Sequence, residues 1–117
     1  MHELAICRSL VDAMLEEFRR LEPTAKRITR VRVVAGRLHQ LVPDFLRSAY
    51  EVFTQDTPAE GSELELEIVP LEGRCRACGW KGEIEPPVFQ CARCDACAIE
   101  LDGGKELVLD RMEIEER

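Results

Sequence analysis

The sequence lacks both the long apolar run and the excess of positive charge that characterise two large classes of protein. No apolar stretch approaches the roughly 20 residues that a membrane-spanning helix needs, so a transmembrane protein is not expected. The 16 lysine and arginine residues are outnumbered by 23 aspartate and glutamate residues, which leaves a formal net charge of −7. A protein whose main role is to bind nucleic-acid phosphates would carry the opposite balance.

Targeting and catalytic motifs are missing as well. The first residues, Met1-His2-Glu3, contain no basic segment of the kind that opens a secretory signal, so we expect a cytoplasmic protein. No glycine-rich loop of the phosphate-binding type and no paired nucleophile and base are recognisable, so we do not expect an enzyme. With 117 residues and 45% hydrophobic residues, the chain is expected to fold as one domain or as one domain with a small satellite.

The cysteines, in contrast, are clustered and regularly spaced. Five of the six cysteines lie between positions 75 and 97, and they include the pairs Cys75-Arg-Ala-Cys78 and Cys91-Ala-Arg-Cys94, twelve residues apart. In a reducing compartment this spacing is typical of zinc sites rather than of disulfides. Four thiolates at about 2.3 Å would complete a tetrahedral structural site and leave no open position for a catalytic water. The sequence therefore predicts structural Zn²⁺ as a cofactor.

The ligand set has one competitor. Cys94-Asp-Ala-Cys97 is a third, overlapping CxxC, so Cys97 could replace Cys91 or Cys94. We choose Cys91 with Cys94, because this pair mirrors Cys75 with Cys78. Cys7 lies on the apolar face of a predicted helix and is interpreted as a small buried hydrophobic residue.

Hydrophobic periodicity predicts the remaining elements. Residues 4–21 carry apolar side chains at helical spacing, with Leu4, Val11 and Phe18 expected in the core. Residues 28–35 are rich in β-branched residues and predict a strand. A second helix is expected to begin at Pro43 and to carry Phe45, Leu46, Ala49, Tyr50 and Phe53.

Two further strands complete the predicted fold. Residues 63–69 alternate between glutamate and apolar residues, and residues 106–115 return to strand character. The predicted class is α+β: a small two-layer domain of two helices on a three-stranded sheet, formed by residues 1–69 and 106–117. Residues 70–105 would form an inserted zinc-ribbon domain.

The amino terminus offers a second set of metal donors. The amine of Met1, the adjacent backbone nitrogens and the imidazole of His2 lie within a few bonds of one another and could wrap around one ion in fused chelate rings. Ni(II) and Cu(II) favour square-planar sets of nitrogen donors. Glu3 could add its backbone nitrogen or its carboxylate.

The order of motifs along the chain resembles the HypA/HybF family of nickel metallochaperones, which serve [NiFe]-hydrogenase maturation. The resemblance covers essentially the full length. It is carried by Met1-His2-Glu3-Leu4 before an amphipathic helix, by Gly36-Arg-Leu, by Val42-Pro43-Asp-Phe-Leu, by both cysteine pairs and by the ending Met112-Glu-Ile-Glu115. One departure is Ala92, which stands where the family usually has proline.

The resemblance implies a nickel site at His2, with Met1 and Glu3 beside it, and a structural zinc held by Cys75, Cys78, Cys91 and Cys94. It implies a nickel-delivering GTPase and the hydrogenase large subunit as partners, and urease is a second possible recipient by the same analogy.

A zinc-ribbon interaction module that binds protein or nucleic acid is the alternative reading. Segment 71–105 holds five basic and six acidic residues and no basic stripe, which argues against nucleic acid as a partner. Neither nucleic acid nor a membrane is expected as a partner.

Overall fold

The structure is a computed structural model that describes residues 2–21 and 23–117, with the backbone alone at His2. The chain forms two compact units. The first unit comprises Met1–Val33, Leu41–Glu67 and Val108–Arg117, and the second comprises Val34–Gln40 and Ile68–Leu107.

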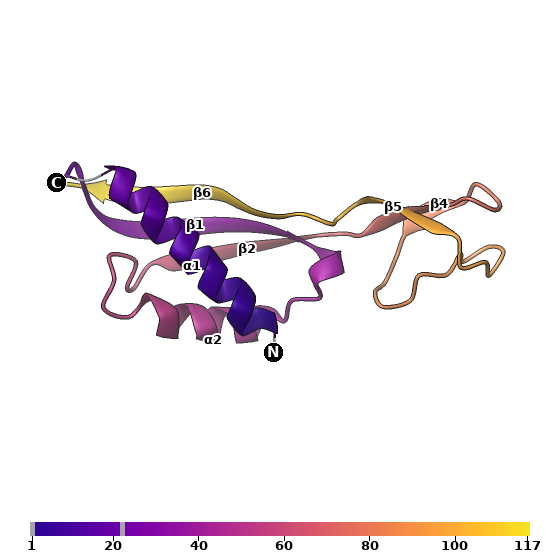
Figure 1. The fold of residues 1–117 in the computed structure, drawn as a ribbon, viewed down its shortest axis with the longest axis horizontal. Helices are drawn as coiled ribbons and strands as arrows, with labels where there is room; N and C mark the ends of the chain where they lie inside the picture. The colour runs from indigo at the N-terminus through magenta and orange to yellow at the C-terminus, as the bar shows by residue number, and fades with distance from the viewer. Residues whose placement is uncertain (1, 22) are drawn as a thin grey trace. The chain divides into compact units, whose positions relative to one another are not determined.

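The first unit is a two-layer α+β structure, as predicted. Its helices are α1 (His2–Leu21) and α2 (Pro43–Thr54), and its strands are β1 (Ala25–Gly36), β2 (Glu63–Val69) and β6 (Leu107–Glu116). Each of the three strands also has one to three residues in the second unit. The strands form one sheet in the order β2-β1-β6, so the earliest strand lies in the centre (Figure 1). The helix that follows Val42 does begin at Pro43, a residue suited to a first helical position.

Helix α1 buries one face, as its apolar spacing predicts. Cys7, Val11, Met14 and Phe18 are all at most 3% exposed. The thiol of Cys7 points at the Leu46 carbonyl oxygen of α2, at 3.9 Å, and burial raises the pKa of this thiol to about 11. The interpretation of Cys7 as a small buried hydrophobic residue is therefore confirmed.

The prediction that Leu4 lies in the core is wrong. Its side chain is 43% exposed and lines an open apolar groove together with Phe45, Val52 and Phe53. Phe45 and Val52 are themselves more than half exposed, so α2 offers Leu4 no cover. In this first turn the buried residue is Glu3. Helical periodicity identifies the face of a helix but not how far along the helix that face is covered.

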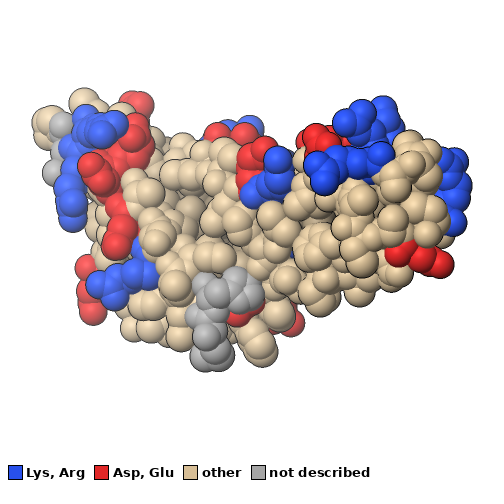
Figure 2. Space-filling view, turned by 45° about the vertical axis from the view of Figure 1, so that its right-hand side comes forward, with Lys and Arg blue, Asp and Glu red and all other residues tan. Residues whose placement is uncertain are grey.

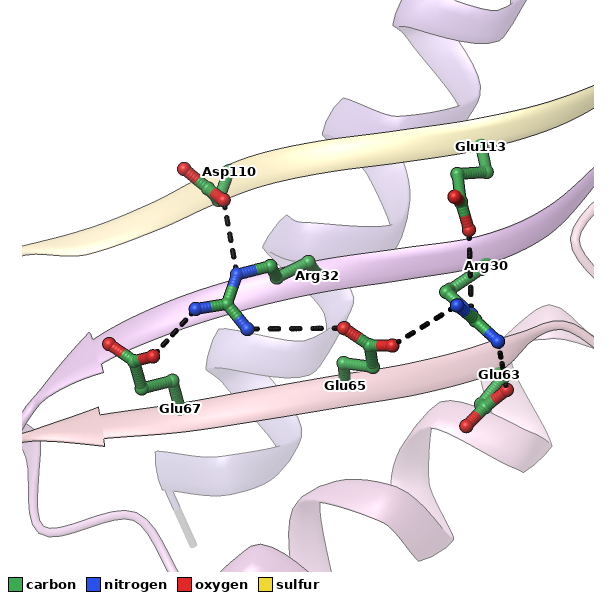
Figure 3. Close-up of polar contacts among 7 residues, drawn as sticks. All are labelled: Arg30, Arg32, Glu63, Glu65, Glu67, Asp110 and Glu113. Atoms are coloured by element: carbon green, nitrogen blue, oxygen red, sulfur yellow. Dashed lines mark hydrogen bonds and ion pairs between the residues drawn. The ribbon is translucent and has the colours of Figure 1, made fainter.

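The face of the sheet that points away from the buried core carries a ladder of ion pairs. Val31 and Val33 of β1 are fully buried, and the alternate residues Arg30 and Arg32 point to the other side. Figure 3 shows both guanidinium groups reaching carboxylates of the two neighbouring strands, with α1 passing behind. The acidic partners are Glu63, Glu65 and Glu113 for Arg30, and Glu65, Glu67 and Asp110 for Arg32.

This ladder makes the central strand the cationic partner of both edge strands. Exposed ion pairs contribute only about 0.2–1 kcal/mol each, so the ladder favours one register of the strands more than it stabilises the unit. The alternating glutamates of residues 63–69 are therefore specific partners of the two arginines.

The second unit contains a smaller sheet with the order β4-β3-β5. Its strands are β3 (Glu72–Cys75), β4 (Lys81–Glu83) and β5 (Ile99–Gly103), and both neighbours run antiparallel to β3. The segment Val34–Gln40, which contains the short 3-10 helix η1 (Arg37–His39), groups with this unit, whereas the sequence analysis placed it with the first. The backbone N–H groups of Gly36 and Leu38 donate to the carbonyl oxygens of Glu106 and Gly104.

No helix in the described part of the chain combines the length and the apolar character that crossing a membrane requires.

The difference in burial along α1 can be tested by truncation. Phe18→Ala should lower the free energy of unfolding by about 3–5 kcal/mol, because it empties a fully packed position. Leu4→Ala, its matched control on the same helix, should lower it by less than about 1 kcal/mol. Urea denaturation followed by circular dichroism measures both values, and similar losses for the two variants would contradict the exposure of Leu4.

Candidate metal centre

The first cysteine loop, Cys75–Trp80, is a tight turn that begins at the end of β3. The backbone N–H of Cys75 donates to the carbonyl oxygen of Trp80 at 2.7 Å, and that of Gly79 donates to Cys75 at 2.9 Å. Gly79 has a φ of 81°, a conformation that glycine adopts at no steric cost. These two bonds turn the chain so that the Cys75 and Cys78 side chains share one side.

The second cysteine loop, Cys91–Ala96, repeats this pattern. The N–H of Cys91 donates to Ala96 at 3.0 Å, and the N–H of Asp95 donates to Cys91 at 3.1 Å. The position equivalent to Gly79 is Asp95, which has a φ of 62°. A side chain in this left-handed region costs about 1–2 kcal/mol, so the second loop is the more strained of the two.

The two loops bring four thiols into one cluster. The sulfurs of Cys75, Cys78, Cys91 and Cys94 all lie within 4.8 Å of one another. The Sγ–Sγ distance is 3.7 Å between Cys75 and Cys94 and 3.6 Å between Cys78 and Cys91. Four sulfurs placed tetrahedrally at about 2.3 Å from one Zn²⁺ lie about 3.8 Å apart, so the cluster fits this ion. The exposed Cys97 is not a member of the cluster.

The electrostatics of the cluster also favour a cation. The backbone N–H of Trp80 is the main group that lowers the pKa of the Cys78 thiol, to about 6. The N–H of Ala96 acts on Cys94 in the same direction, but desolvation and the neighbouring thiols outweigh it and raise the pKa of Cys94 to about 12. Thiols this close cannot all be ionised at neutral pH without a positive charge among them. A bound Zn²⁺ would supply that charge.

Arg93 is a member of the site that the sequence analysis did not identify. Its backbone N–H and that of Cys94 each donate to the sulfur of Cys91 at 3.3 Å, and its side chain donates to the carbonyl oxygen of Cys78 at 2.5 Å. A CxxC motif marks the residue between its cysteines only as variable, so no signal in the sequence pointed to this contact.

The predicted nickel residues are only partly described. Met1 and the side chain of His2 lie outside the described residues, although the backbone of His2 begins α1. Glu3 is 7% exposed, and its carboxylate accepts a hydrogen bond from the backbone N–H of Val42 at 3.3 Å. This contact ties the first turn of α1 to the start of α2.

Comparison with known proteins assigns the chain to a family. Residues 1–114 match the family model described as "Hydrogenase/urease nickel incorporation, metallochaperone, hypA". Two relatives described as hydrogenase maturation factor HypA come from Chlorobium limicola and Desulfitobacterium hafniense. The first is 38% identical and aligns over 99% of this chain and 98% of the relative. The second is 33% identical and aligns over 99% of this chain and all of the relative.

Solved structures agree at the level of the fold. The solution structure of the Ni metallochaperone HypA from Helicobacter pylori matches with a TM-score of 0.61 and 23% identity, covering 96% of each chain. A second solution structure, of HypA protein, matches with a TM-score of 0.57 and 26% identity, covering 98% of this chain and 97% of the other. The full-length family match and the identity to its curated members establish that this chain belongs to the HypA family.

Proposed function

We propose that this protein is a nickel metallochaperone that binds Ni(II) at its N-terminus and delivers it for the maturation of [NiFe]-hydrogenase. Urease is a second candidate recipient. The observation that carries the proposal is the family match over residues 1–114, since that range includes both the N-terminal donors and the cysteine loops. Delivery of a metal requires that the protein bind and release the ion, not that it make or break covalent bonds of a substrate. We therefore propose no catalytic residue.

The cargo site consists of Met1, His2 and Glu3. The N–H groups of the first helical turn lie outside the i→i−4 ladder, so a metal that displaces an amide proton there breaks no bond of that ladder. The buried carboxylate of Glu3 already accepts the Val42 N–H. We therefore assign the Met1 amine, backbone nitrogens and the His2 imidazole to nickel, and to the Glu3 carboxylate the role of holding the start of α1 in place.

Release of the nickel depends on the same nitrogen donors that bind it. An amine or amide nitrogen must lose a proton before it can bind Ni(II), so acid competes with the metal. Nickel affinity should therefore fall as the pH falls.

Zinc has a structural role in this proposal. Cys75, Cys78, Cys91 and Cys94 would hold it, and the ion would neutralise the thiolates and join the two cysteine loops. Because four sulfurs complete a tetrahedral site, the zinc would remain with the protein while nickel is exchanged.

The partners are a GTPase that supplies nickel and the hydrogenase large subunit that receives it. The exposed charges of α1, namely Arg8, Asp12 and Glu16, lie on the same helix as the nickel residues and are candidate contacts. Arg8 and Asp12 form an exposed ion pair at 3.8 Å, which a partner could replace at little cost.

A nucleic-acid-binding zinc ribbon is not favoured. Figure 2 shows one face of the molecule, on which lysine and arginine side chains lie in separate groups, several with acidic side chains beside them. Arg74 pairs with Glu100 and Arg37 pairs with Glu85, so part of the positive charge of the second unit is already compensated. A continuous basic surface is what phosphate binding requires.

Nickel binding should depend on the imidazole of His2. His2→Ala removes this donor and should abolish tight binding, whereas Glu3→Gln keeps the backbone donors and should change the affinity only a few-fold. Nickel titration of the untagged chain, followed by the visible d–d band of planar Ni(II), measures both. Equal affinity in the native chain and in His2→Ala would refute the N-terminal site.

The terminal amine can be tested separately. Extra residues placed before Met1 move the amine away from the imidazole while leaving every side chain intact. If the amine is a ligand, as we propose, this extension should weaken nickel binding and leave the zinc content unchanged. Undiminished binding would mean that amides and imidazole suffice.

Zinc content should distinguish the four cluster cysteines from Cys97. The native chain and Cys97→Ala should each contain about one zinc per chain by elemental analysis. Cys91→Ala should lose it, and residues 68–107 should become sensitive to protease while the helical signal of α1 persists. Loss of zinc from Cys97→Ala would show that the wrong ligand set was chosen.

The strain at Asp95 should limit the stability of the second cysteine loop. Asp95→Gly removes both the side chain from a positive-φ position and a carboxylate next to the thiolates, so zinc release to a chelator should slow a few-fold. Asp95→Ala also removes the carboxylate but keeps a β-carbon at the positive φ, so it should release zinc faster than Asp95→Gly does. A faster release from Asp95→Gly would contradict this.

A further inference from the structure

One residue of the second cysteine loop contacts the first. Arg93 lies between Cys91 and Cys94, and its guanidinium donates to the carbonyl oxygen of Cys78 at 2.5 Å, fifteen residues earlier in the chain. The backbone N–H of the same residue donates to the sulfur of Cys91 at 3.3 Å. Arg93 thus contacts a ligand residue of each loop at once.

The two loops differ at this position. Their backbone hydrogen bonds repeat, but the residue of the first loop that corresponds to Arg93 is Ala77, which has no side chain to reach across. The neighbouring Arg76 is exposed, and its side chain makes no hydrogen bond or ion pair among the described residues. The link between the loops is therefore one-sided, from Arg93 to Cys78.

The charge and geometry of the proposed zinc site explain what the Arg93–Cys78 contact could contribute. One Zn²⁺ with four thiolates leaves an excess of negative charge, and a guanidinium beside them offsets part of it. A charge-assisted hydrogen bond to the ligand residue's own carbonyl also fixes where that ligand lies. Groups that orient metal ligands in this way typically contribute about 10–100-fold to metal affinity.

We infer that Arg93 is a positioning residue for the zinc site, which clamps the first cysteine loop to the second through the Cys78 carbonyl. The inference rests on the proposed zinc ligands. Arg93 precedes by two residues Asp95, which has the left-handed conformation.

The test compares zinc affinity in three variants of the full chain, by competition with a chromogenic chelator at neutral pH. Arg93→Gln removes the positive charge and the guanidinium donor, and it should weaken zinc binding by about 10–100-fold. Arg76→Gln removes the same charge from the other loop and should bind zinc as the native chain does. Arg93→Lys keeps a charged donor and should recover most of the loss.

Three results would overturn the clamp: native affinity in Arg93→Gln, an equal loss in Arg76→Gln, or a loss in Arg93→Lys as large as in Arg93→Gln. Substitution with Co²⁺ should give the four-thiolate spectrum in every variant, because the ligands are unchanged. If the native chain itself holds no zinc, or if Cys91→Ala holds as much as native, the proposed zinc site fails. If those two behave as expected and Arg93→Gln binds normally, only the clamp fails.

Discussion

The second unit depends on four thiols held within 4.8 Å of one another. Outside the cysteines its fully or nearly buried apolar residues are few, and they include Ala35, Leu71 and Ile84. So small a core supplies little hydrophobic stabilisation, and small domains of this kind commonly rely on a metal. The strands that carry the cysteine loops are only three to five residues long. The cysteine cluster is therefore expected to stabilise this sheet as much as the sheet positions the cysteines.

The first unit depends on a different kind of interaction. Its core lies between α1, α2 and the central strand β1, where Met14, Val31 and Leu46 are fully buried. Its charged face is organised by Arg30 and Arg32, which pair with strands that lie more than thirty residues later in the sequence. Burial stabilises this unit, and the ion pairs favour its strand register.

The proposed nickel and zinc sites can coexist in one small chain because their donors differ. Nickel in a planar field of nitrogen donors and zinc in a tetrahedral field of sulfur are separated by geometry and ligand softness rather than by affinity alone. The Glu3–Val42 hydrogen bond links the first turn of α1 to the start of α2, next to the residues proposed to bind nickel.

The sequence by itself determined the features that depend on neighbours in the chain: the helix of residues 4–21, the start of α2 at Pro43, the strand of residues 63–69 and the quartet of cysteines. Local periodicity and CxxC spacing are sufficient for these. Only the tertiary structure decided what depends on distant segments: the exposure of Leu4, the grouping of Val34–Gln40 with the second unit, and the reach of Arg93 to Cys78. The strands β3 and β4, which contain Glu-Gly-Arg-Cys and Lys-Gly-Glu, have no periodic pattern to recognise. Their structure comes from pairing across the sheet and from the cysteine cluster at its end, and neither interaction can be read from a short stretch of sequence.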